Sequence, residues 1–171
     1  CRPQVVTGED QQGVPEQKLV HTPGIKTIDE LSEFLNQPKT ALIKSMIYQG
    51  DDKLFLVMVR GDREINEVKL NNLMGPFITL KLAEEDAVRQ LLGCEVGFLG
   101  PIDVPQNITV LAAEEVALMR YATVGANKTD YHLTGVKVAD LRIDKVADLR
   151  MVTPGEPCPK CQAPLKEARG I

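Results

Sequence analysis

Two strand-length segments joined by a tight turn constrain the fold of this chain most strongly. Residues 40–48 and 54–60 are rich in apolar and β-branched side chains, and Gly50-Asp51-Asp52 between them suits a hairpin turn. The sequence therefore predicts an antiparallel hairpin. Lys44 lies within the first segment and has apolar neighbours on both sides, so it either faces solvent or points into a pocket.

Helical patterns accompany the hairpin. Thr27 and Glu30 form a capping box, apolar residues follow at helical spacing, and Pro38 ends the predicted helix. Further helices are expected over residues 64–73 and 83–92, and strands over residues 77–82, 108–112, 116–124 and 131–138. Because helices and strands mix without regular βαβ units, we predict an α+β fold. Its sheet is mixed and largely antiparallel, or forms a partly closed barrel, and is flanked by helices.

The chain of 171 residues is long enough for one compact domain. Residues 1–18 are polar and are expected to form an extended lead-in, residues 19–152 the domain, and residues 153–171 a proline-rich exit segment. The apolar runs are too short to span a bilayer, and the first residues lack the pattern of a signal peptide. We therefore expect a cytoplasmic protein without a membrane partner.

Charge and composition limit the nucleic-acid partners. The net charge is −4, whereas proteins that bind long stretches of nucleic-acid backbone carry a basic excess, because phosphate contacts dominate that binding. Aromatic residues make up only 4% of the chain, which argues against platforms for base stacking. Any nucleic acid is therefore expected to be contacted only at a short terminus.

The four cysteines do not indicate a disulfide framework. Only Cys158-Pro159-Lys160-Cys161 has the spacing of metal ligands, and a structural zinc site needs four ligands. Because no second such pair and no paired histidines follow, we expect no metal here. The motif is then a proline-rich turn or the remnant of a lost site.

One of the two histidines follows a loop of small residues. Gly125 and Asn127 tolerate left-handed backbone angles and allow backbone N–H groups to approach a ligand. His132 lies at the exit of this loop, where it is able to exchange a proton or a hydrogen bond. The loop is therefore a candidate binding site.

A second candidate is the turn formed by Gly97, Gly100 and Pro101, whose backbone N–H groups suit an oxyanion or a water molecule. Each feature also has an ordinary structural explanation. The turn also fits a simple connection, Lys44 a solvated lysine on an amphipathic strand, and His132 a half-buried histidine bonded to the backbone. No Ser-His-Asp or Cys-His arrangement is visible in the sequence.

Taken together, these features resemble the insertion (editing) domain of bacterial prolyl-tRNA synthetases, in the YbaK-like aminoacyl-tRNA deacylase family. The resemblance runs through Thr22-Pro23, Lys26-Thr27-Ile28, residues 40–44, Arg60-Gly61-Asp62, residues 66–70, residues 97–101, Gly125-Ala126-Asn127 and Tyr131-His132. The tail, Cys158 to Cys161 with residues 168–171, resembles the point where such a synthetase re-enters its catalytic domain. The sequence is therefore expected to be a domain excised from a longer enzyme.

The resemblance implies post-transfer editing, which is hydrolysis of the ester that joins alanine to the terminal adenosine of a proline tRNA. A site built for proline cannot strongly reject the smaller alanine, because the lost apolar contact is worth only about 1–3 kcal/mol. The implied partners are the aminoacylated acceptor end of the tRNA and the rest of the synthetase. No cofactor is implied for the editing domain, and ATP and magnesium belong to the catalytic domain of the parent enzyme.

The resemblance also implies residue roles. Lys44 anchors the terminal phosphate or the ester of the substrate, and the turn with Gly97 and Gly100 holds the carbonyl and the attacking water. Thr22 contacts the terminal ribose and His132 shapes the alanine pocket. The remaining substrate-binding residues are Pro101, Gly125 and Asn127. The chemistry of the family leans on the ribose hydroxyl of the substrate.

Two alternatives stay open. A free-standing, trans-acting deacylase of the same superfamily would share the pocket, and a non-catalytic insertion would only support tRNA docking. An active domain is expected to gather Thr22, Lys44, Gly97 and His132 around one small cavity.

Overall fold

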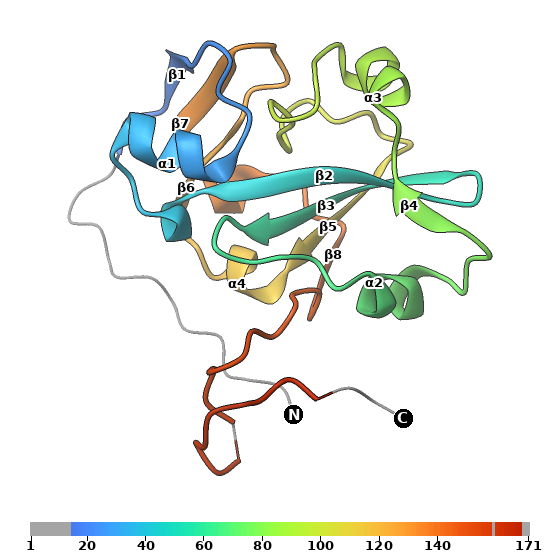
Figure 1. Cartoon of the computed structure of the whole chain (residues 1–171). Coiled ribbons are helices and arrows are strands. Elements are labelled where there is room, and N and C mark those ends of the chain that lie inside the picture. The colour runs from blue at the N-terminus through green and yellow to red at the C-terminus, as the bar shows by residue number, and fades with distance from the viewer. Residues whose placement is uncertain (1–14, 159, 169–171) are drawn as a thin grey trace.

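A computed structural model describes residues 15–158 and 160–168 of the chain. Its elements lie in an order that mixes helices and strands (Figure 1). They are β1 (Lys18–His21), α1 (Ile28–Leu35), η1 (Lys39–Ala41), β2 (Ile43–Gly50), β3 (Lys53–Arg60), α2 (Glu67–Met74), β4 (Leu80–Leu82), α3 (Glu85–Leu92), β5 (Thr109–Ala113), α4 (Glu114–Ala117), β6 (Tyr121–Gly125), β7 (Tyr131–Lys137), η2 (Val138–Asp140) and β8 (Lys145–Ala147).

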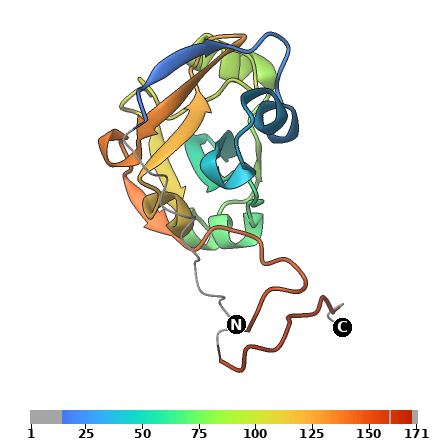
Figure 2. The same ribbon diagram turned by 90° about the vertical axis from the view of Figure 1, so that its left-hand side faces the viewer.

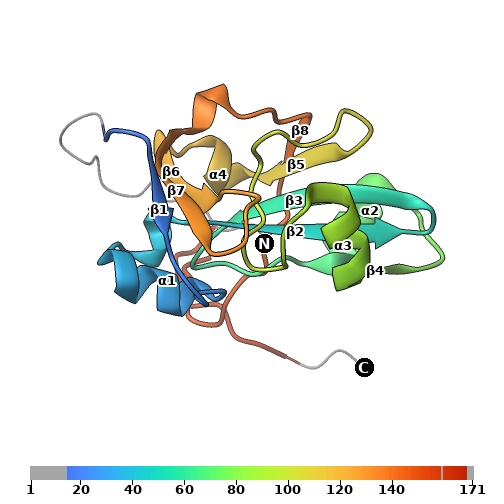
Figure 3. The ribbon, with the colours of Figure 1, turned by 90° about the horizontal axis from the view of Figure 1, so that it is seen from above.

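The strands form two sheets. The larger has the order β4-β2-β3-β5-β8, and the smaller has the order β1-β7-β6. Pairing is antiparallel except for β3 with β5 and β5 with β8, which are parallel. A parallel bridge between Leu42 and Thr123 links the two sheets, which do not close into a barrel over the described residues (Figure 3). The predicted α+β class with a mixed, largely antiparallel sheet is confirmed.

The hairpin predicted from the sequence is present. β2 pairs with β3 in unbroken register from Ile43 opposite Arg60 to Gly50 opposite Lys53. Asp51 in the turn has φ 50°, a left-handed angle that aspartate tolerates better than most residues. The capping box at α1 is also present, since Thr27 accepts from the Glu30 backbone and Glu30 bonds back to Thr27.

Several element boundaries differ from the prediction, and two of these differences have a clear local cause. The strand expected over residues 116–124 is wrong in its first part, because α4 occupies Glu114–Ala117 and β6 begins only at Tyr121. The helix expected over residues 64–73 begins at Glu67. Asn66 caps it by accepting from the Lys69 N–H at 3.1 Å, while Ile65 instead bridges Arg150.

Two hydrophobic clusters cover the two faces of the larger sheet. In β3, Leu56 and Met58 face a cluster shared with α3 and the smaller sheet, while Val57 and Val59 face a cluster under α2. Figure 1 shows α2 and α3 on opposite sides of β2 and β3. The first cluster joins the two sheets and thereby fixes the elements that carry the predicted site.

The chain leaves this body after β8 as a segment without helix, which extends away from both sheets (Figure 2). A bridge between Pro157 and Pro164 folds its end into a short hairpin. Within the described part of the chain, no helix is both long and apolar enough to cross a membrane.

Candidate functional site

His132 lies in a buried cluster built from three separate parts of the chain. β7 pairs it with Val20 of β1 on one side and with Gly125 of β6 on the other. The Thr22 hydroxyl lies 2.7 Å from its Nδ1 atom, and the Phe98 ring centroid lies 5.5 Å from its own. Thr22 is 0% and His132 is 4% exposed, so this hydrogen bond is shielded from water.

The environment of His132 favours a neutral ring. Burial lowers its pKa, and a backbone hydrogen bond with Gly97 partly opposes that shift. A bond that raises a histidine pKa must accept an N–H from the ring, so Gly97 contributes its carbonyl oxygen. The Thr22 hydroxyl at Nδ1 and the Gly97 backbone are thus the two polar partners of the ring. These contacts and the burial of the ring suit a fixed wall better than a proton shuttle.

The 97–101 turn packs backbone to backbone against the 125–132 loop. A Cβ atom on Gly100 would lie 1.7 Å from the Gly125 carbonyl oxygen, and one on Gly125 would lie 2.1 Å from the Leu99 carbonyl oxygen. Gly97 has φ +105°, an angle that side chains rarely adopt. Glycine is therefore required at Gly100 and Gly125 by the close approach of the turn to β6, and at Gly97 by its backbone angle and the nearby Lys26.

Asn127 fastens the turn to the loop. Its side chain accepts from the Gly100 N–H at 2.8 Å and donates to the Gly100 carbonyl at 3.0 Å and to the Ile102 carbonyl. Its own N–H donates to the Phe98 carbonyl at 3.0 Å. Pro101, next to Gly100, is buried. Asn127 therefore positions the turn, and the Gly100 N–H is already engaged within the protein.

Asp130 is a residue to which the sequence reasoning gave no chemical role. Its carboxylate accepts from the Gly24 N–H at 2.8 Å, and its carbonyl accepts from the Thr22 N–H at 2.8 Å. It therefore holds the segment that carries Thr22 against the loop. Its place two residues before His132 is the signal that could have indicated this role.

The side chain of Lys44 lies on the face of β2 opposite to the face that carries Ile43 and Ile47. Ile43 and Ile47 pack in the cluster between the sheets, and Tyr48, which points the same way as Lys44, belongs to the cluster under α2. The Lys44 ammonium donates to both carboxylate oxygens of Glu64, at 2.9 and 2.7 Å. The structure thus brings Thr22, Gly97, Gly100, Gly125, Asn127 and His132 together, and places the side chain of Lys44 apart from them on Glu64.

The backbone of Lys44 is nonetheless close to the loop. The bridge from Leu42 to Thr123 lies two residues before Lys44 on β2 and two residues before Gly125 on β6, so the two residues lie at the same level. The Glu64 carboxylate is 68% exposed, and such an ion pair contributes roughly 0–1 kcal/mol. The ion pair with Glu64 therefore holds the Lys44 side chain only weakly.

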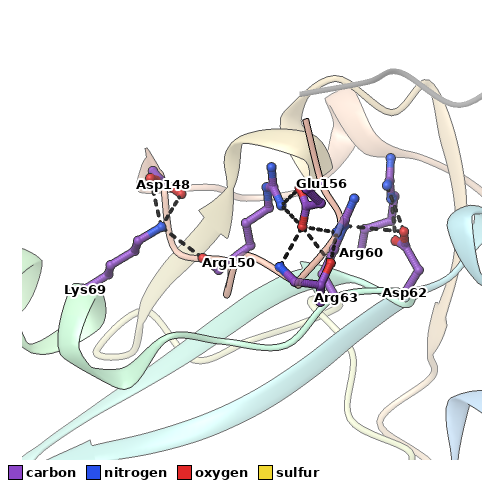
Figure 4. A network of polar contacts seen from close by, with 8 residues as sticks. Arg60, Asp62, Arg63, Lys69, Asp148, Arg150 and Glu156 are labelled. Carbon is purple, nitrogen blue, oxygen red and sulfur yellow. Dashed lines mark hydrogen bonds and ion pairs between the residues drawn. The ribbon is translucent and has the colours of Figure 1, made fainter. Parts of the chain in front are cut away.

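A second polar network holds the exit segment (Figure 4). Glu156 accepts from Arg63 at 2.8 Å, from Arg150 at 3.0 and 2.7 Å, and from the N–H and hydroxyl of Thr153 at 2.8 and 2.7 Å. Burial alone would raise the pKa of Glu156, but the bonds from Thr153 and Arg150 outweigh it and lower the pKa to about 2. Sequence reasoning missed this clamp.

Within the Arg60-Gly61-Asp62 segment, Arg60 and Asp62 form an ion pair with a structural role. Arg60 donates to Asp62 from Nε at 2.5 Å and from Nη2 at 2.9 Å, and the Gly61 N–H donates to the Leu42 carbonyl at 2.8 Å.

On α4, Glu115 is 3% exposed, and neither of its carboxylate oxygens has a hydrogen-bond partner among the described residues. The local sequence gave no sign of this buried carboxylate.

The comparisons with known proteins identify the family of this chain. The sequence model of the aminoacyl-tRNA editing domain matches residues 22–143, from Thr22 through β7 and η2. The chain belongs to this family. A hypothetical protein, APE2540, shares the fold with a TM-score of 0.68 at 20% identity, covering 80% of this chain and 92% of that one. A protein described as a candidate trans-editing enzyme for prolyl tRNA synthetase shares it with a TM-score of 0.65 at 18% identity, over 80% and 87% of the two chains.

Sequence relatives of this editing domain are longer proteins. It is 55% identical to a proline--tRNA ligase of Desulfitobacterium hafniense over 172 residues, which is 100% of this chain and 30% of the relative. It is 44% identical to the proline--tRNA ligase of Heliobacterium modesticaldum, over 100% of this chain and 29% of that one. The chain thus spans less than a third of the length of these relatives.

Proposed function

We propose that this editing domain hydrolyses mischarged alanyl-tRNA(Pro) as part of a proline--tRNA ligase. The family match and the full-length similarity to the matching segment of proline--tRNA ligases support the reaction class and the parent enzyme. In this proposal the domain contacts the aminoacylated acceptor end of the tRNA and the rest of the synthetase. It acts in the cytoplasm without a cofactor, while ATP and magnesium serve the parent enzyme's catalytic domain.

The observation that carries the proposal is the fixation of His132. A site that admits alanine and excludes proline needs a wall that does not yield, since a flexible side chain would let the larger ring in. The imidazole is held at Nδ1 by Thr22, contacts the Gly97 backbone, and is 4% exposed. We therefore assign discrimination by size to His132, with Thr22 as its positioning residue.

The chemistry proposed for this site is addition of water to the ester carbonyl. The tetrahedral intermediate then collapses, releasing alanine and returning a proton to the ribose oxygen that leaves. Donors aimed at the developing oxyanion are worth the most in such a step. The Gly100 N–H already donates to the Asn127 side chain at 2.8 Å. We therefore assign Gly100 to holding the turn in place, and the Gly97 N–H to the carbonyl of the reacting ester.

Lys44 is proposed to bind the terminal phosphate of the tRNA. It lies at the level of Gly125, and its present partner Glu64 is exposed and displaceable. A domain with a net charge of −4 binds nucleic acid weakly on its own. Tethering to the synthetase supplies the effective concentration that makes a weak contact sufficient.

The proposal is tested by hydrolysis of alanyl-, prolyl- and cysteinyl-tRNA substrates by this chain, as free domain and in the presence of a synthetase lacking its own editing domain. We expect release of alanine and little release of proline. Equal release from all three esters, or none in either setting, would reject the assignment.

A matched pair of variants separates a substrate role of Lys44 from a structural one. Lys44→Met is expected to lower alanine release by roughly 10- to 150-fold, which corresponds to the loss of about 1.5–3 kcal/mol for a hydrogen bond to a charged phosphate. Glu64→Gln breaks the same ion pair but keeps the lysine, so it should retain activity or raise it. Equal losses in both variants, measured with folding checked by circular dichroism, would mean that the ion pair itself is what matters.

A further inference from the structure

Three side chains without a role in the proposed function form a cluster at the end of the smaller sheet, where β1 and β7 lie side by side (Figure 1). β1 ends at His21, β7 begins at Tyr131, and these two residues are paired across the strands. Their ring centroids lie 4.9 Å apart with 33° between the ring planes. The Lys128 ammonium lies 4.1 Å from the centroid of the Tyr131 ring. His21, Lys128 and Tyr131 are called the His21 cluster below.

The His21 cluster is adjacent to the candidate site. The residues that follow His21 and Tyr131 are Thr22 and His132, whose side chains form the buried hydrogen bond. The Asp130 carbonyl accepts from the Thr22 N–H at 2.8 Å and fixes this end of the sheet. Because neighbouring side chains of a strand point to opposite faces, the cluster and the buried pair lie on opposite faces of the same sheet end. A substrate that reaches the buried pair around this end also meets the cluster.

The charge on Lys128 is available to an anion. Lys26 and Lys44, the other lysines beside the site, each pair with a glutamate at 2.7 Å. Lys128 is exposed, and within the described part of the chain its ammonium contacts the Tyr131 ring and no carboxylate at ion-pair distance. A phosphate can therefore bind Lys128 without displacing an acidic side chain.

A cation beside an exposed ring matches the two parts of a nucleotide in a single strand. Lysine binds a phosphate as a point charge, and a flat ring offers a surface on which any base can stack. The His21 side chain is exposed, so its ring is accessible to a base. The low aromatic content of the sequence argued against such a platform, but that count leaves out histidine and does not show which distant rings meet.

We propose that the His21 cluster binds the single-stranded end of the tRNA next to its terminal adenosine, with one base stacked on His21 and one phosphate on Lys128. This subsite rests on the proposed function, in which the ester on the terminal adenosine reaches the Thr22–His132 pair. A contact to so few nucleotides is compatible with the net charge of −4, because tethering to the synthetase supplies the effective concentration.

Hydrolysis of alanyl-tRNA(Pro) by the 171-residue chain tests the subsite through KM and its dependence on salt. His21→Ala should raise KM roughly 5- to 150-fold, the range for loss of one stacked base, with little change in kcat. Lys128→Gln should also raise KM. It should reduce the slope of log KM against log salt concentration by about 0.7, the value for one phosphate contact to a single strand. Lys128→Arg keeps the charge and should recover most of both losses.

Lys137→Gln is the matched control for Lys128→Gln. It removes the same charge from the other end of β7, where Lys137 is 56% exposed and lies 3.8 Å from Asp140. KM and the salt slope should stay at their parent values. Equal effects of the two substitutions would show that net charge alone controls binding, which would overturn the subsite.

Binding of an RNA without an amino acid separates the subsite from the proposed reaction. The probe is a hairpin that carries the acceptor end of tRNA(Pro), titrated into the chain and followed by NMR. The ring signals of His21 and Tyr131 should shift saturably, and the shifts should weaken in Lys128→Gln and vanish when the hairpin lacks its single-stranded nucleotides. Saturable shifts without alanine release would support the subsite and reject the reaction. Alanine release without ring shifts up to millimolar RNA would reject the subsite and leave the reaction standing.

Discussion

At the scale of single residues, the hydrogen bond between Thr22 and His132 can be tested with an isosteric pair of variants. Thr22→Val keeps the shape of a fully buried side chain but leaves Nδ1 of His132 without its hydrogen-bond partner. An unsatisfied buried polar atom costs about 1–3 kcal/mol, so the urea midpoint should fall accordingly. Thr22→Ser restores a hydroxyl and should recover most of the loss. A Thr22→Val protein as stable as the parent would show that the bond contributes nothing.

His132 itself carries the discrimination that we propose. His132→Ala removes the wall that we propose for the alanine site, so hydrolysis of the prolyl ester should rise relative to the alanyl ester by roughly 10- to 200-fold. That is the range that differences of one or two methylenes can control. The measurement is the ratio of kcat/KM for the two esters. An equal loss of activity on both substrates would assign His132 to turnover, or to folding, instead of selectivity.

At the scale of elements, the contact between the 97–101 turn and β6 leaves no room for a side chain. In Gly125→Ala, the new Cβ would lie 2.1 Å from the Leu99 carbonyl oxygen, which is backbone and cannot rotate away. Overpacking of this kind costs about 1–3 kcal/mol, and the shifted turn should also lose editing activity.

Gly24→Ala is the matched control for this contact. Gly24 has φ +72°, but a Cβ atom added there would meet no other atom within 4 Å, so only backbone strain of about 1 kcal/mol is expected. Thermal unfolding and alanine release should both be affected more in Gly125→Ala. A larger loss in Gly24→Ala would contradict the role of close packing.

The sequence predicted local elements better than it predicted how distant segments meet. The capping box at Thr27 and the turn at Asp51 are encoded within a few residues, and both are present. The strand expected over residues 116–124 fails because an apolar run does not distinguish a short helix from a strand. The side-chain partner of Lys44 was missed as well, because Glu64 reaches it through the β2–β3 register.

In the predicted site, too, local features were predicted better than contacts between distant segments. Glycine and asparagine in the 125–132 loop indicated tight backbone geometry, and the structure uses both for contacts within the protein. Neither the bond from Thr22 to His132, which spans 110 residues, nor the buried carboxylate of Glu115 has a local pattern. Such features arise from tertiary packing, which one sequence does not display.

At the scale of the whole molecule, Glu156 decides whether the exit segment stays attached to the editing domain. It joins the segment to Arg63, which follows β3, and to Arg150, which follows β8 (Figure 4). Each lost hydrogen bond to a charged group lowers the stability of this attachment by at most about 3 kcal/mol. In Glu156→Gln, residues 151–168 should therefore be cleaved faster by a protease while the body remains folded. Glu84→Gln, which breaks an exposed pair with Lys81, is the control and should leave cleavage unchanged.

Acid should release the same segment. Because the folded-state pKa of Glu156 is lowered from its ordinary 4.5 to about 2, its contribution is complete above pH 4.5 and is lost as the pH falls toward 2. Between pH 5 and pH 3, the parent chain should therefore lose more of its protection against an acid-active protease than Glu156→Gln, which has no carboxylate to protonate. Parallel cleavage curves for the two proteins over this range would show that the segment is held by contacts other than the Glu156 clamp.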